Sequence, residues 1–263
     1  MKNYLLILSF FTFFISQAQL SNKHWLPPLH ARDESTIQDH YVYLSTAETT
    51  PFQITITTGN GIPIPGSPFT ISQTNPVEVN IGNGQPTDMF LDVTDVNVVK
   101  SDKGLILEGT KDFYVSFRMR HQNHAETLIS KGRPGIGNRF RLGHMINETS
   151  DSRTSFVASV MATENNTTLT LSDYNTNVVF TSGSGDITAD SQSFILNAGQ
   201  SIVFSGYSSL GANLDGALGA LIESSKPVAV NSGNILGGIE YGRADICLDQ
   251  IVSSSQIGDE YIF

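Results

Sequence analysis

The chain has 263 residues, which is long enough for one large domain or two ordinary ones. Hydrophobic residues make up 39% and charged residues 15%, a composition that with its many glycines is typical of turn-rich β proteins rather than helical or disordered ones. The formal charge is −10 and no basic cluster occurs, which excludes nucleic acid as an expected partner.

The first 18 residues are predicted to be an export signal rather than part of the fold. Lys2 gives a short positive start, residues 4–15 are apolar, and residues 16–18 (Ser-Gln-Ala) form a small-residue cleavage site. An apolar run of about 12 residues is too short to span a bilayer. We therefore expect cleavage between Ala18 and Gln19, no membrane span, and a secreted or cell-surface protein.

Short β-type runs dominate the chain from residue 41 onward, and proline, glycine and asparagine turns separate them. Residues 19–36 are interpreted as an irregular lead-in, because Pro27 and Pro28 disfavour both helix and strand. The best helical candidate is the short segment 124–129. The sequence thus predicts an all-β fold.

An internal repeat organises these runs. Residues 104–115 and 219–230 share glycine, glutamate and lysine at one spacing of 115 residues, and each segment is interpreted as a hairpin of two short strands. In the second hairpin we expect Val228 and Val230 on one face and Ile222 with Ala229 on the other. Phe69 and Val77 are matched by Phe194 and Ile202 at a second spacing, 125 residues.

The repeat predicts an irregular segment followed by two β modules, at residues 37–135 and 136–256. A third module is expected to begin at 257–263, because its Ile257-Gly258 and Tyr261 resemble the openings of the earlier units, Ile37 with Tyr41 and Ile136-Gly137 with Phe140. Tandem β-sandwich-like modules are the favoured architecture. An enlarged-blade propeller or a single fused β assembly is the alternative, and the sequence does not decide between them.

Residues with reactive or ligating side chains form no recognised catalytic or metal pattern. His121, His124 and Glu126 lie too unevenly for one face of a helix, and the pairs Asp92/Asp95 and Asp186/Asp190 do not match a calcium loop. The single cysteine, Cys247, is interpreted as a small buried hydrophobe. We expect no enzyme activity, no catalytic residue, no metal site and no cofactor, and no binding residue is identified.

Several motifs together resemble the N-terminal domain family of the IgGFc-binding protein, in the form found on surface proteins of gliding bacteria of the Bacteroidetes type. The matching motifs are His24-Trp25-Leu26-Pro27-Pro28, Tyr43-Leu44-Ser45-Thr46, Ala162-Thr163-Glu164-Asn165-Asn166-Thr167-Thr168-Leu169, Ser225-Lys226-Pro227-Val228-Ala229-Val230, Ser232-Gly233-Asn234 and Cys247-Leu248-Asp249-Gln250. The family often has a cysteine soon after Ser-Gly-Asn, but here residues 235–238 are Ile-Leu-Gly-Gly, so the resemblance does not extend to a disulfide.

This resemblance implies a non-catalytic extracellular module of a secreted bacterial adhesin, with attachment or gliding as its setting. It also implies type IX secretion, with the outer-membrane secretion machinery as a partner through a C-terminal region beyond this sequence. The expected ligand is a cell-surface or extracellular glycan or protein of unknown identity. The alternative is a carbohydrate-binding or accessory region of a secreted polysaccharide hydrolase.

Overall fold

A computed structural model describes residues 20–32, 37–147, 153–240 and 243–256, and 54% of these residues are in strands or β-bridges. The predicted leader and the expected third opening at 257–263 lie outside these residues. The described residues form short 3-10 turns and the strands β1 (Ser21–Leu26), β2 (Ile37–Ser45), β3 (Phe52–Thr58), β4 (Phe69–Ile71), β5 (Val77–Gly82), β6 (Leu105–His121), β7 (His124–Ile129), β8 (Gly137–Arg141), β9 (Ser155–Ala162), β10 (Thr167–Ser172), β11 (Gln192–Leu196), β12 (Ser201–Tyr207), β13 (Leu221–Glu240) and β14 (Arg243–Ile251).

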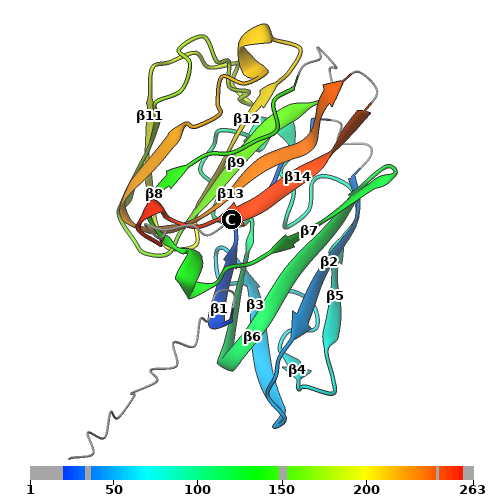
Figure 1. Ribbon diagram of the computed structural model, residues 1–263. Coiled ribbons are helices and arrows are strands. Elements are labelled where there is room, and N and C mark those ends of the chain that lie inside the picture. Colours follow the sequence, from blue (N-terminus) through cyan, green and yellow to red (C-terminus); the bar gives the residue numbers. More distant parts are fainter. Residues whose placement is uncertain (1–19, 33–36, 148–152, 241–242, 257–263) are drawn as a thin grey trace, which may run out of the picture.

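The strands form two copies of one arrangement, stacked in Figure 1 as a lower module 1 (β1–β7) and an upper module 2 (β8–β14). Module 1 has the strand order β4-β3-β6-β2-β5, with β1 and β7 also paired to β6. Module 2 has the order β11-β10-β13-β9-β12, with β8 and β14 paired to β13. Each strand of module 2 is thus the counterpart of the strand seven places earlier, which confirms the internal repeat and the tandem all-β modules.

The strand registers reproduce the two spacings seen in the sequence. Thr55 lies opposite Glu108, as Thr170 lies opposite Glu223, at the 115-residue spacing. On β4 and β11 the spacing is 125 residues, since Ile54 pairs with Phe69 and Leu169 pairs with Phe194. The ten additional residues therefore lie between β10 and β11.

The predicted hairpins are wrong, because each repeated segment belongs to one long, bent strand. The first part of β6 pairs with β1 and β3, and its second part pairs with β2 and β7. Likewise β13 pairs first with β8 and β10, then with β9 and β14. The register shifts between Glu223 and Val228, where Pro227 has no N–H to donate. The turn formers therefore mark a bend that carries one strand from the first sheet of a module into the second.

The continuity of β13 also overturns the expected faces of the second segment. Ile222 packs in the same core as Val228 and Val230, whereas Ala229 packs against Trp25 of module 1. Alternation along one continuous strand puts Ile222 on the same side as Val228 and Val230, because these positions are an even number of residues apart. The expectation of opposite faces depended on a hairpin turn that does not form.

Two other local predictions are corrected by strand pairing. Residues 21–26 are strand β1 rather than an irregular lead-in, because they pair along β6 and end before Pro27. Residues 124–129 are strand β7 rather than a helical turn, because they pair with the end of β6. The match between Tyr41 and Phe140 as openings of the two units is also wrong. Tyr41 lies on β2, whereas Phe140 lies on β8, which is the counterpart of β1.

The modules meet where one sheet of module 2 packs its outer face on module 1. All eight residues of β9 are buried, because one side faces the core of module 2 and the other faces module 1. Val157, Val203 and Leu248 project from this sheet into the hydrophobic core of module 1. Met161 and Ala229 pack beside Trp25. The two modules therefore share a continuous buried interface.

A buried hydrogen-bond network completes this interface. Gln250, 2% exposed, donates through Nε2 to the Trp25 carbonyl at 2.8 Å. Its Oε1 accepts from the Lys131 amide at 2.6 Å and from Ser130 Oγ at 3.1 Å. Asn231 Nδ2 donates to the Pro27 carbonyl at 3.0 Å. The main chain of the His-Trp-Leu-Pro-Pro motif is thus held by side chains of module 2.

Replacing Gln250 tests this interface. We expect Gln250→Leu to lower the free energy of unfolding by about 2–4 kcal/mol, because it leaves the partners of Gln250 buried without hydrogen bonds. The neighbouring Asp249→Asn, which disrupts a partly exposed pair with Lys131, should cost under about 1 kcal/mol. Urea unfolding of a chain that spans residues 19–263 measures both, and equal losses would contradict the assigned role of Gln250.

Two buried histidines of the segment that enters the interface make stability depend on pH. Burial lowers the pKa of His24 and of His30 from 6.5 to about 4. The unfolded chain therefore binds protons between pH 6.5 and 4 that the folded chain does not bind, so stability falls as the pH falls through this range. At pH 5 the loss is roughly 2 kcal/mol for each histidine. We expect a lower melting temperature at pH 5 than at pH 7.5. An unchanged melting temperature would contradict the burial of neutral imidazoles. The control His124→Gln replaces a partly exposed histidine of β7 and should leave the difference between the two pH values in place.

Candidate binding surface

The sheet of module 1 that corresponds to the buried sheet of module 2 is exposed. Across β7, β6, β2 and β5 one row of outward residues is Thr127, Arg118, Tyr41 and Asn80. The equivalent row of module 2 is Leu248, Gly233, Val157 and Ser205, and it packs on module 1. In the next row, module 1 has Glu78 and Tyr43 at the positions where module 2 has Val203 and Ser159. At equivalent positions, module 1 thus carries mainly polar and charged side chains and module 2 mainly apolar or small ones, as expected for an exposed and a buried surface.

We name this surface the tyrosine–arginine face and define it by Tyr41, Tyr43, Arg118 and Arg120, with Asp39 and Glu78 beside them. Strand alternation orients these side chains outward, because Val42, Leu44, Phe117 and Met119 between them are buried in the core. Arg118, Arg120 and Glu78 are exposed and the tyrosines are half-buried. A hollow of about 280 Å³ lies between the tyrosines and the arginines.

The polar groups of the tyrosine–arginine face hold one another in place. The Tyr41 and Tyr43 rings have centroids 6.4 Å apart and are tilted by 48°. Arg120 is fixed from two sides, since its Nε lies 3.0 Å from Asp39 Oδ2 and its Nη2 donates to Gln38 Oε1 at 2.7 Å. The Tyr43 hydroxyl interacts with Glu78 and Arg118, and the hydrogen bond to Glu78 is the main cause of its raised pKa.

A backbone irregularity positions Asp39. Its φ is 55°, in the left-handed region, and the register of β2 shifts between Gln38 and Tyr41. Its amide donates to Asn83 Oδ1 at 3.1 Å, which stabilises the bulge. Bulges re-aim side chains, and backbone strain of this kind concentrates at functional sites. Here the bulge presents the Asp39 carboxylate to Arg120.

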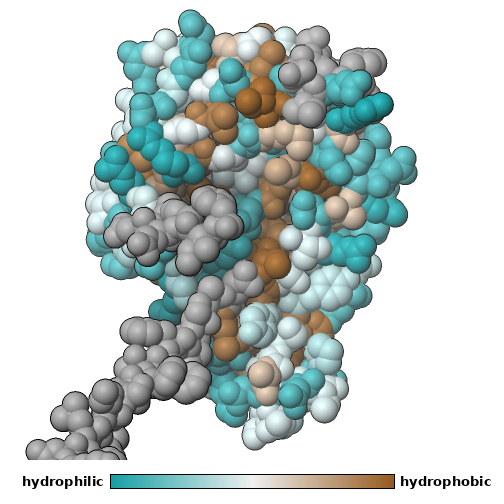
Figure 2. All heavy atoms as spheres, in the orientation of Figure 1, coloured by the Kyte–Doolittle hydropathy of each residue, from teal (hydrophilic) through white to brown (hydrophobic). Residues whose placement is uncertain are grey.

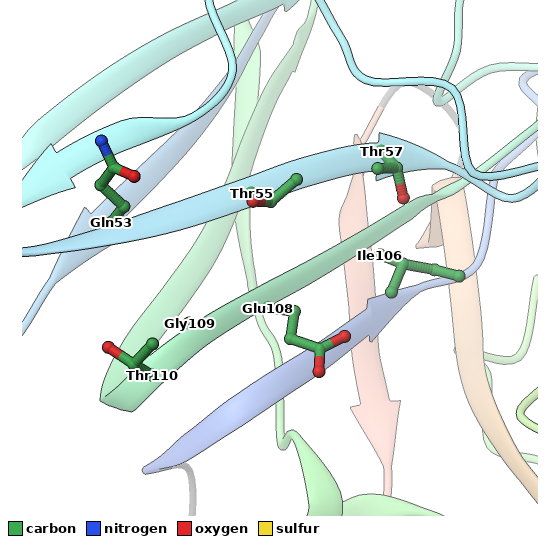
Figure 3. Close-up of a pocket in the computed structure, with 7 residues that line it drawn as sticks. All are labelled: Gln53, Thr55, Thr57, Ile106, Glu108, Gly109 and Thr110. Carbon is green, nitrogen blue, oxygen red and sulfur yellow. The ribbon is translucent and has the colours of Figure 1, made fainter.

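A second hollow lies on the other sheet of module 1, between β3 and β6 (Figure 3). It has a volume of about 480 Å³ and is lined mainly by polar side chains. The lining residues are Gln53, Thr55, Thr57, Ile106, Glu108, Gly109 and Thr110. Glu108 is bound by Lys23 at 2.7 Å. Module 2 repeats this arrangement with Thr170, Glu223 and Arg139. Because both modules carry it, we assign this surface to the shared scaffold.

A third hollow, of about 520 Å³, lies beside β14 and residues 143–145 and includes Cys247. Figure 2 shows hydrophobic surface gathered along the middle of the view, over β13 and β14. Cys247 is exposed, contrary to the predicted buried hydrophobe, because Ile246 and Leu248 alternate with it and take the positions facing module 1. Partial burial of the thiol is the main cause of its raised pKa, and nearby carboxylates add to it, so the reactive thiolate is disfavoured.

The other residues considered from sequence are dispersed. His121 is buried, while His124 pairs through Nδ1 with Asp245 at 3.1 Å. Asp92 caps a short 3-10 turn, and Asp95 pairs with Lys100 at 3.0 Å. Asp186 and Asp190 are exposed between β10 and β11. Among the residues that the structure describes, no group of three or more His, Cys, Asp or Glu side chains could hold a metal ion.

The tyrosine–arginine face was missed in the sequence because its residues come from separate strands. The available signal was the alternation of buried residues with tyrosine and arginine in 41–44 and 117–120. Only the pairing of Tyr41 with Arg118 brings the two sets together.

Fold and surface together define a two-module all-β scaffold with one exposed face of tyrosines and arginines. The sequence model of the family described as IgGFc binding protein matches residues 125–263, just over half of the chain. The chain therefore belongs to the IgGFc-binding family, as its motifs indicated. No curated protein and no solved structure matches the chain. In the described part of the chain, no helix is long and apolar enough to cross a membrane.

Substitutions on adjacent residues of β2 test which side is surface. We expect Tyr43→Ser, which introduces the residue found at the equivalent Ser159, to cost under about 1 kcal/mol of unfolding free energy. Val42→Ser on the buried side should cost about 2–4 kcal/mol through lost burial and an unpaired hydroxyl. Urea unfolding compares them, and a larger loss for Tyr43→Ser would place the tyrosine in the core.

Proposed function

We propose that this chain is a non-catalytic extracellular interaction module of a secreted bacterial cell-surface adhesin. Its predicted leader directs it out of the cytoplasm, and the IgGFc-binding family to which it belongs is a family of binding domains. The setting we propose is attachment or gliding, with export by the type IX route. The expected partner is a glycan or protein of the extracellular surface.

The observation that carries this proposal is the contrast between the two copies of one sheet. In module 2 this sheet is occupied by module 1, whereas in module 1 it is open and displays tyrosines and arginines. Tyrosine and arginine are enriched at interfaces, because each combines a large apolar area with hydrogen-bonding atoms. The exposed copy therefore has the composition of a recognition surface.

The reactive residues of the described chain are used for structure, which supports a non-catalytic role. His24 and His30 are buried, and their imidazole nitrogens donate hydrogen bonds to main-chain carbonyls and also bind neighbouring hydroxyl groups. His144 lies in a stacked arrangement with Phe156, and burial lowers its pKa. The Cys247 thiol has a raised pKa. None of these groups has the pKa of an activated acid, base or nucleophile near neutral pH.

A carbohydrate-binding or accessory region of a secreted polysaccharide hydrolase is the second candidate. The observation that favours it is the pair of tyrosine rings beside hydrogen-bonding side chains, an arrangement that also suits sugars. The two functions differ in whether the chain mediates adhesion by itself.

Adhesion of coated beads tests the proposal. Beads carrying the mature chain, residues 19–263, are passed under flow over surfaces coated with mucin, fibronectin, cellulose or β-glucan. We expect retention above that of bare beads on at least one surface, and a tenfold or greater loss with the double variant Tyr43→Ser/Arg120→Ala, because it removes the centre of the tyrosine–arginine face.

The control variant Thr55→Ala, on the other sheet of module 1, should adhere like the unmodified chain. Retention no greater than that of bare beads on every surface would contradict an adhesin. Equal retention by the double variant would contradict the assignment of this face. Binding in solution to polysaccharides without retention under flow would favour the hydrolase accessory.

A further inference from the structure

Resting on the proposed function, we infer that the tyrosine–arginine face binds an uncharged oligosaccharide chain. The two tyrosine rings supply the first requirement, an apolar platform for the C–H faces of sugar rings. Tyr41 and Tyr43 lie on the same side of strand β2, with ring centroids 6.4 Å apart. Each ring is half-buried by its neighbours, so its orientation is restrained before any ligand arrives.

The charges of the face select against a charged ligand. Arg120 is paired with Asp39, and both Arg118 and Glu78 interact with the Tyr43 hydroxyl. Two cations are thus matched by two carboxylates. An anionic ligand at Arg120 would have to displace Asp39, and one at Arg118 would meet the Glu78 carboxylate that binds the same Tyr43 hydroxyl. A cationic ligand at Asp39 would have to displace Arg120. Sugar hydroxyls both donate and accept, so they can use the remaining guanidinium N–H groups and carboxylate lone pairs without breaking these pairs.

The surroundings disfavour a protein partner. Stable protein interfaces bury more than about 1,000 Å² and have an apolar centre. The outward residues next to the tyrosines are Ser45, Asn80, Ser116 and Thr127. The exposed large hydrophobic side chains of this face, Tyr114 opposite Ser45 and Ile129 opposite Ser116, lie toward one end of it rather than at its centre. Polar neighbours of this kind satisfy a ligand covered with hydroxyl groups, whereas they would leave a protein interface without a hydrophobic centre.

Shape and rigidity agree with a sugar chain lying across the strands. The hollow of about 280 Å³ is close to the lower end of small-molecule sites, which suits one sugar ring with its neighbours resting on the adjoining surface. The polar groups are pre-positioned by the sheet and by the bulge at Asp39, so little conformational entropy is lost on binding.

Affinity electrophoresis of the mature chain tests the inference. Gels contain either a neutral polysaccharide (cellulose ether, laminarin, mannan or dextran) or an anionic one (heparin or polygalacturonate). We expect retardation by at least one neutral polysaccharide, with little change in 0.5 M NaCl, since the contacts are not ion pairs with the ligand. Tyr43→Ser should weaken binding at least tenfold, and Arg120→Lys should weaken it several-fold by removing the planar fork held by Asp39 and Gln38.

The variants Tyr43→Phe and Thr55→Ala make the result interpretable. Tyr43→Phe keeps the stacking ring and should retain most of the binding, whereas Thr55→Ala should behave as the unmodified chain. Circular dichroism and melting temperature confirm that each variant is folded. Three results would overturn the inference: no retardation in any neutral gel, retardation only in anionic gels with loss in salt, or unaltered binding by Tyr43→Ser. If beads adhere to fibronectin through this face while neutral gels show no binding, the proposed function stands and the sugar ligand is wrong.

Discussion

One sheet of module 2 must bury both of its faces, and the rest of the structure depends on this constraint. Every residue of β9 is buried, so its two sets of alternating side chains fill two different cores. Burying a polar atom in such a layer costs free energy unless the atom has a hydrogen-bond partner. Gln250 and Asn231 meet this condition by binding the carbonyls of Trp25 and Pro27. The interface therefore combines apolar packing with directional bonds that define how the modules are placed.

This constraint explains why several family motifs are far apart in the sequence. His-Trp-Leu-Pro-Pro supplies the main chain that module 2 binds, and the later Asp-Gln supplies the side chain that binds it. Ser-Gly-Asn has a different role beside the interface. Asn234 accepts from the Met145 amide at 2.6 Å and donates to the Ser155 carbonyl at 3.1 Å, so it holds the segment after β8 against β9. These motifs stabilise the two-module assembly rather than form a reactive site.

The corresponding sheet of module 1 buries only one of its faces, because nothing in the described chain covers the other. The same scaffold can therefore carry tyrosine, arginine and threonine where module 2 carries valine, glycine and leucine, respectively. On the other sheet the two modules have instead kept the same kind of surface. Each carries threonines and one ion pair, lysine with glutamate in module 1 and arginine with glutamate in module 2. Divergence between copies of one repeat thus separates a candidate recognition surface from the scaffold. The electrostatic pairing within the tyrosine–arginine face then narrows the chemistry of its ligand.

The sequence by itself determined the fold class, the repeat, its two spacings and the family. These depend on local composition, on turn residues and on motif order, all of which can be read along one chain.

Prediction from the sequence failed where long-range strand pairing overrides the local preference of a segment. Serine, lysine and proline near residue 226 have the composition of a turn, but partners on both sides keep β13 continuous and bent. The segments 21–26 and 124–129 are strands because β6 offers them free hydrogen-bonding groups. Only the tertiary structure decided which sheet is buried and which is open, since Tyr41 and Arg118 become neighbours through strand register alone, and the register depends on the whole packed module.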